Sequence, residues 1–129
     1  ERLTTHVDRF LTSFGALALL LSSCLSLLAF AITAVLIDAT ALVALAASGY
    51  RPDNKRPGHH AVTIQSLTLT LGISGTRIAA LDKLREKRNL SDYTGAPLDE
   101  VATESCVDQA TRLIAELREW IPRNHPELA

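Results

Sequence analysis

The 129 residues of this chain are enough for one domain with its own hydrophobic core, and too few for two such domains. Thirteen Lys and Arg residues against fourteen Asp and Glu residues give a formal net charge of −1, which excludes attraction to nucleic acid or to an anionic membrane through overall charge. A partner of either kind would have to be recognised by a local patch.

The N-terminal part of the chain is strongly apolar. Between Arg9 and Arg51 the only charged residue is Asp38, and the segment from Phe14 to Ile37 has no charge at all. A run of about 18 or more apolar residues is long enough for a transmembrane helix. Alanine and serine recur through it, and small residues suit close helix packing in a bundle as well as in lipid. We favour a buried bundle core in a cytoplasmic protein, with insertion of residues 14–47 into a membrane as the alternative.

The two cysteines lie far apart in apolar surroundings. Cys24 follows Leu21-Ser22-Ser23, which is similar to a lipoprotein processing site, but the apolar character continues well beyond it. Reduced, packed thiols are therefore favoured over lipidation and over a disulfide framework.

In chain order, the first predicted helix covers about residues 5–21. The serines between residues 22 and 26 offer a break, although no glycine or proline confirms it, and one long helix stays an alternative. A second helix over about 27–48 would end at Gly49, because glycine suits a left-handed C-terminal cap. Residues 51–58 form a basic connector rich in turn-forming residues.

Three more helices follow the connector. Apolar residues at spacings of three and four predict a helix over about 59–71, with a strand as a minor alternative because threonines lower its helix propensity. The same periodicity predicts helices over about 76–94 and 99–121, the last opening at Pro97 or at Asp99. The whole chain, 1–129, is thus expected to form a single all-α domain, an up-down bundle of four to five helices.

The helix predicted over 76–94 changes character in its last turns. Ile78, Leu81 and Leu84 form an apolar stripe, and the helical period places Arg88 and Asp92 in line with it. Charged groups facing a helix interface are costly unless they have partners. We therefore single out a candidate site that comprises four residues: Arg88, Asn89, Asp92 and Tyr93. The plainer interpretation is a structural ion pair, and the sharper one is a guanidinium that contacts a phosphate.

This segment carries a family resemblance. Arg85-Glu-Lys-Arg88-Asn89-Leu-Ser-Asp92-Tyr93-Thr-Gly95 resembles the late helix of HEPN domains, whose signature is an Arg, often followed by Asn, with a His four to six residues later. Gly49-Tyr50-Arg51-Pro52 and Pro57-Gly58-His59-His60 are similar to the middle segment of one bacterial branch of that family. The resemblance covers roughly residues 45–121 and is poor over 10–40.

The resemblance implies a HEPN-like bundle, with Arg88 and Asn89 at the signature positions. Many HEPN proteins are metal-independent endoribonucleases of toxin-antitoxin systems, in which Arg and His from two subunits form one cleft. The signature histidine is missing here, since Tyr93 occupies its window, and a tyrosine with an ordinary pKa near 10 is a poor general acid or base. A binding or interaction role is therefore favoured over catalysis.

A basic surface beside Arg88 is the second expectation. His59 could supply the imidazole that the signature lacks. Two adjacent histidines alone make a weak metal site, so we expect neither a metal nor a cofactor. The residues that could bind a nucleotide or RNA are Arg51, Lys55, Arg56, His59, His60, Arg85 and Lys87.

The leading hypothesis is thus a HEPN-like nucleotide- or RNA-binding or interaction module. We expect a homodimer, because the apolar N-terminal part exceeds what one small bundle can hide. The resemblance adds a minimal nucleotidyltransferase as a partner in a toxin-antitoxin pair. The alternatives are a metal-independent endoribonuclease that uses Arg88 and a membrane-anchored helical protein.

Overall fold

A computed structural model describes the backbone of residues 2–95 and 99–129, and the side chains of the same residues except 2–8, 10, 11 and 23. All regular structure in these residues is helical, as predicted. The elements are α1 Arg2–Ala47, α2 His59–Gln65, α3 Leu67–Thr70, α4 Gly75–Thr94, α5 Glu100–Asn124 and the short 3-10 helix η1 Pro126–Leu128.

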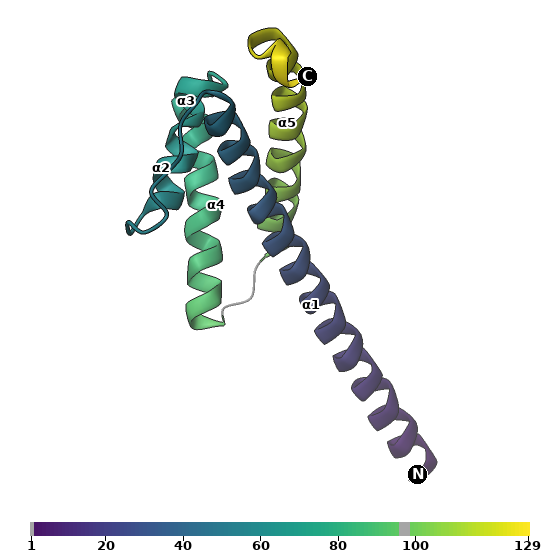
Figure 1. Ribbon diagram of the computed structural model, residues 1–129. Helices are drawn as coiled ribbons and strands as arrows, with labels where there is room; N and C mark the ends of the chain where they lie inside the picture. The colour runs from purple at the N-terminus through teal and green to yellow at the C-terminus, as the bar shows by residue number, and fades with distance from the viewer. Residues whose placement is uncertain (1, 96–98) are drawn as a thin grey trace.

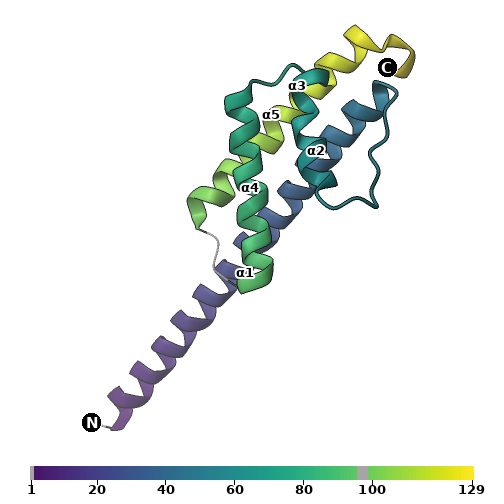
Figure 2. The same ribbon diagram turned by 90° about the vertical axis from the view of Figure 1, so that its left-hand side faces the viewer.

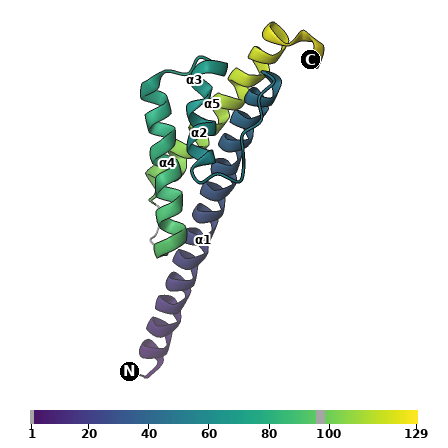
Figure 3. The ribbon, with the colours of Figure 1, turned by 60° about the vertical axis from the view of Figure 1, so that its left-hand side comes forward.

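The N-terminal segment forms one helix of 46 residues, so the expected break between residues 22 and 26 is wrong. Serine costs only a few tenths of a kcal/mol in a helix, and the leucines and alanines around it are good helix formers. Only the C-terminal half of α1 packs against the other helices. The N-terminal half extends away from them in all three ribbon views (Figures 1, 2 and 3).

The bundle consists of the C-terminal half of α1 with α2 to α5. Helices α1 and α5 run in the same general direction and form the most extensive contact, while α4 runs in the opposite direction (Figures 1 and 2). Their facing sides form one core. It comprises Phe30, Ala34, Ile37, Ala41, Ile64, Leu67, Ile73, Leu81, Leu84, Ala102, Cys106, Ala110 and Leu113.

Local signals fix the ends of α4 and α5 near the predicted bounds. The Ser74 side chain accepts a hydrogen bond from the Arg77 amide at the start of α4, and Gly95 adopts the left-handed conformation, φ 65°, at its end. Asp99 Oδ1 accepts from the Ala102 amide, 2.5 Å, and so caps α5. Pro97, the other predicted start of α5, lies outside the described residues.

Two boundaries differ from the prediction. The helix expected over 59–71 is divided at Ser66 into α2 and α3. Helix α5 continues through Pro122 to Asn124, and the turn after the proline still closes, with His125 N bonded to Ile121 O at 2.7 Å.

The two cysteines are free and differ in environment. Cys106 is buried in the core, where Thr33 Oγ1 donates a hydrogen bond to its Sγ, 3.1 Å, and burial raises the pKa of its thiol. Cys24 is exposed on the projecting half of α1, so the expectation of a packed thiol is right for Cys106 and wrong for Cys24.

Candidate functional site

Asp38, the single charged residue in the middle of α1, lies in a small groove between α1, α2 and α4. Its side chain is only 16% exposed, and its Oδ2 lies 3.3 Å from Nδ1 of His60 at the start of α2. Gly58, with φ 81°, turns the chain from the connector into α2 and so brings both histidines to this position. A carboxylate in such a place needs partners, since an isolated buried charge is costly.

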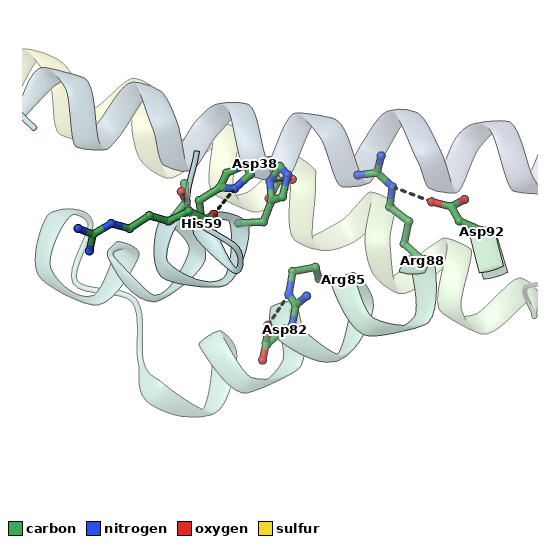
Figure 4. A network of polar contacts seen from close by, with 9 residues as sticks. Asp38, His59, Asp82, Arg85, Arg88 and Asp92 are labelled. Carbon is green, nitrogen blue, oxygen red and sulfur yellow. Dashed lines mark hydrogen bonds and ion pairs between the residues drawn. The ribbon is translucent and has the colours of Figure 1, made fainter. Parts of the chain in front are cut away.

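Four basic groups act electrostatically on this carboxylate, and one of them, His60, contacts it directly. Burial raises the pKa of Asp38, and the nearby groups that oppose this effect are His60, Arg88, Arg85 and His59. The imidazoles come from α2 and the guanidiniums from α4. Figure 4 shows Asp38 beside His59, with Arg85 and Arg88 on the neighbouring helix. Three segments that are distant in the sequence therefore share one electrostatic site.

Arg88 occupies the inward position that the helical period predicts, but Asp92 does not. The Arg88 side chain is 33% exposed and extends towards α1, whereas Asp92 is 65% exposed, with 3.9 Å between Arg88 Nε and Asp92 Oδ2 (Figure 4). The buried residue at this level of α4 is Ser91. The expected pair of inward-facing charges is therefore only half present: Arg88 faces inward, and Asp92 is a loosely held carboxylate in solvent.

The floor of the groove is a small cavity. It is lined by Asp38, Arg85 and Arg88 and by apolar side chains from α1, α2 and α4. Its volume of about 10 Å³ is room for about one water molecule. Arg85 closes one side, where its Nε donates to Asp82 Oδ1 at 2.7 Å. A ligand larger than water would have to lie over the rim, where Arg88 and His60 are accessible.

The remaining predicted site residues are not gathered at this groove. Asn89 and Tyr93 are exposed on a flank of α4, and Tyr93 retains 91% of its accessible surface. Lys87 lines a separate, open depression with Lys83, Glu86 and Leu90, and it pairs with Asp99 at 3.7 Å. The basic residues therefore do not form one continuous surface beside Arg88.

The connector contributes a second, exposed group of cations. Arg51, Lys55 and Arg56 are all exposed, and Arg56 pairs with Asp53 at 3.4 Å. One contact joins this segment to the groove: His59 Nδ1 lies 3.1 Å from the Arg56 carbonyl oxygen. The rings of His59 and His60 are adjacent, with centroids 4.0 Å apart. Across the described residues, no group of three His, Cys, Asp or Glu side chains is placed to hold a metal ion.

Asp38 is the site residue that the sequence pattern did not single out. The sequence did contain a feature that could have identified Asp38: a lone charge inside a long apolar helix needs a buried partner or a functional reason. Together, a carboxylate, two imidazoles and two guanidiniums form an arrangement that can orient an imidazole and contact an anion at its rim. Comparison of the chain with protein family models, with curated proteins and with solved structures finds no match.

Proposed function

We propose that this chain is a HEPN-like helical binding module that takes a phosphate-bearing ligand, a nucleotide or RNA, at the rim of the Asp38 groove. The observation that carries the proposal is that Arg85 and Arg88 line one small cavity with Asp38, whose carboxylate contacts His60 at 3.3 Å. A planar guanidinium at a partly buried position suits the oxygens of a phosphate.

Arg88 is the group best placed for a phosphate contact. Its ion pair with Asp92 is long, 3.9 Å, and Asp92 is 65% exposed. Exposed pairs of this kind contribute little to stability, so a phosphate can replace the Asp92 carboxylate at small cost. Arg85 is less available because Asp82 holds it at 2.7 Å. His60, whose side chain is 58% exposed, provides a second donor at the same rim.

The test is binding of a fluorescein-labelled, 20-nucleotide single-stranded RNA followed by anisotropy. We expect Arg88→Gln to weaken binding about tenfold, the size of one lost charge-assisted hydrogen bond. The matched control is Arg112→Gln, because Arg112 also forms a loose i,i+4 pair, with Asp108 at 3.7 Å, but lies on α5 away from the groove. Equal affinities for the two variants would refute the proposal.

An endoribonuclease is the second candidate, and the Asp38–His60 contact favours it. A carboxylate that orients an imidazole beside a guanidinium is a common arrangement for general acid-base chemistry. His60 would then replace the signature histidine that Tyr93 displaces. If the wild type cleaves the same RNA, and His60→Gln abolishes cleavage but still binds the RNA, His60 is part of the catalytic mechanism. Cleavage that survives in His60→Gln would remove His60 from the mechanism.

A regular apolar stripe on α1 supports the proposed homodimer. Ten positions that alternate at spacings of three and four are all exposed and all apolar, and we call them the outer seam. They are Phe14, Ala18, Leu21, Leu25, Leu28, Ile32, Val35, Ala39, Leu42 and Ala46. A sustained seven-residue repeat of this kind is typical of a helix that packs against another helix.

The outer seam fits a second copy of α1 along the bundle. In the C-terminal half of α1, the opposite side already packs on the core through Phe30, Ile37 and Ala41, so the seam is the side left free. Alanines at three of the ten positions allow close approach of two helices. The partner proposed from the family resemblance, a minimal nucleotidyltransferase, would then bind the dimer elsewhere.

A further inference from the structure

In the projecting half of α1, the segment from Thr12 to Leu28 has no charged residue, and its apolar side chains lie on every side of the helix. The part Thr12–Ala47 is long and apolar enough to cross a membrane; an 18-residue window within it has a mean hydropathy of 2.4, and the bundle buries 18% of that window. From Arg9 to Leu25 every residue whose side chain is described is exposed, and the large ones include Leu17, Leu20 and Leu25 at 54%, 65% and 68%. This exposed apolar surface needs an occupant.

A second copy of the chain would not cover it. A partner on the outer seam leaves the far side of the helix in water, and in soluble coiled coils those positions are polar or charged. Here they include Leu19, Leu20 and Leu27, which are 72%, 65% and 46% exposed. A helix that is apolar on all sides needs apolar surroundings on all sides, and the acyl region of a bilayer provides them.

The length of the free half agrees with a bilayer. No residue from Phe10 to Leu28 is charged, Arg9 precedes this segment, and bundle contacts begin with partly buried Ser26 and Ala29 and fully buried Phe30. At 1.5 Å per residue the segment is about 28 Å long, close to the roughly 30 Å of the hydrocarbon core. Asp38 lies about 15 Å beyond its end, so the groove would be in the aqueous phase near the membrane surface.

We propose that residues 10–28 of α1 cross a lipid bilayer and hold the bundle at the membrane surface. This inference does not depend on the phosphate site, since it rests on other residues. It also agrees with the outer seam, because two such helices can pack on each other within lipid while acyl chains cover their far sides.

The experiment is flotation of the full-length chain with neutral phosphatidylcholine vesicles, after reconstitution, in high salt and again after alkaline carbonate extraction. We expect the wild-type chain to float under both conditions. We expect Leu20→Arg, near the middle of the span, to reduce the vesicle-bound to free ratio at least about a hundredfold. The matched control is Leu69→Arg, because Leu69 is 90% exposed on the bundle, and this variant should float like the wild type.

A second readout uses the cysteines of the chain. Cys106 is buried in the core, so labelling by a water-soluble maleimide reports on exposed Cys24, which lies inside the proposed span. We expect Cys24 to be protected in vesicles in the wild type and in Leu69→Arg, and labelled in Leu20→Arg. A wild-type chain that stays in the aqueous fraction, as a monomer or as a soluble homodimer, would overturn the proposal. Flotation of Leu20→Arg at the wild-type level would also overturn it.

Discussion

Asp38 on α1 and His60 on α2 are in direct contact, with 3.3 Å between Oδ2 and Nδ1. This contact fixes the start of α2 against the middle of a helix that is otherwise apolar. It also places an acid with 16% exposure next to the two arginines of α4. The position of the proposed binding rim follows from this one buried carboxylate.

The raised pKa of Asp38 predicts a pH-dependent effect of Asp38→Asn. Burial raises the pKa above its ordinary value of 3.8, against the opposing effects of His60, Arg88, Arg85 and His59. The folded state therefore binds the proton more tightly than the unfolded state, and the stability that this provides is lost as the pH rises through the folded pKa. The free energy of unfolding of Asp38→Asn, relative to the wild type, should increase from pH 3.5 to pH 7.

The measurement is urea unfolding followed by circular dichroism at several pH values. Titrating groups that do not interact with Asp38 cancel in the difference between the two proteins. Asp108→Asn removes an acid that is 63% exposed on α5 and serves as the matched control. A relative stability of Asp38→Asn that falls as the pH rises would contradict the burial of the charge.

Two large apolar side chains on α1 test which half of this helix belongs to the bundle. Phe30 is 1% exposed, so Phe30→Ala should reduce the free energy of unfolding by about 3–5 kcal/mol. Leu20, which is 65% exposed, lies on the projecting half outside the outer seam, and Leu20→Ala should change the free energy of unfolding by less than about 0.5 kcal/mol. Chemical unfolding in mild detergent measures both, and similar losses in the two variants would mean that the projecting half also folds against the core.

Arg77 joins α4 to α5 and should contribute to stability. Its Nε donates to Gln109 Oε1 at 2.9 Å, and it forms an ion pair with Glu116 while only 15% exposed. We expect Arg77→Leu to cost about 1–3 kcal/mol, because the half-buried acid loses its partner. Arg112→Leu, from an exposed pair, should cost less than about 0.5 kcal/mol. Thermal unfolding that ranks the two variants in the opposite order would contradict this role.

The outer seam predicts a dimer that a single charge can weaken. Val35 is 51% exposed on the seam, and Val35→Glu should shift the chain towards monomers, since it places two like charges opposite each other in the dimer. Val101→Glu alters a residue that is 75% exposed on α5 and should leave the dimer intact. Sedimentation equilibrium in detergent micelles measures both, and a wild-type monomer would exclude the seam as an interface.

The sequence predicted best those elements that carry their own end signals. Ser74, Gly95 and Asp99 define the ends of α4 and α5 through local hydrogen bonds and a left-handed turn, so their bounds could be read from residue types alone. The serines of residues 22–26 resembled a break but are compatible with a continuous helix, and nothing local distinguishes the two.

The site was predicted less completely, for a different physical reason. The helical period placed Arg88 correctly because Arg88 continues the stripe of Leu81 and Leu84, which lines the same cavity. Asp92 lies only a small rotation away, and the packing of α1 and α5, which a single-helix pattern does not contain, leaves it in solvent. The meeting of Asp38 with His60 depends on how α2 folds back on α1, and this is a tertiary property.

The salt dependence of RNA binding tests the proposed guanidinium-phosphate contact most directly. Each phosphate neutralised on a single strand contributes about 0.7 to the slope of log affinity against log salt concentration. We expect Arg88→Gln to reduce the magnitude of the slope by about 0.7 relative to the wild type, and Arg112→Gln to leave it unchanged. Identical slopes for the wild type and Arg88→Gln would show that Arg88 contacts no phosphate and would contradict the proposed function.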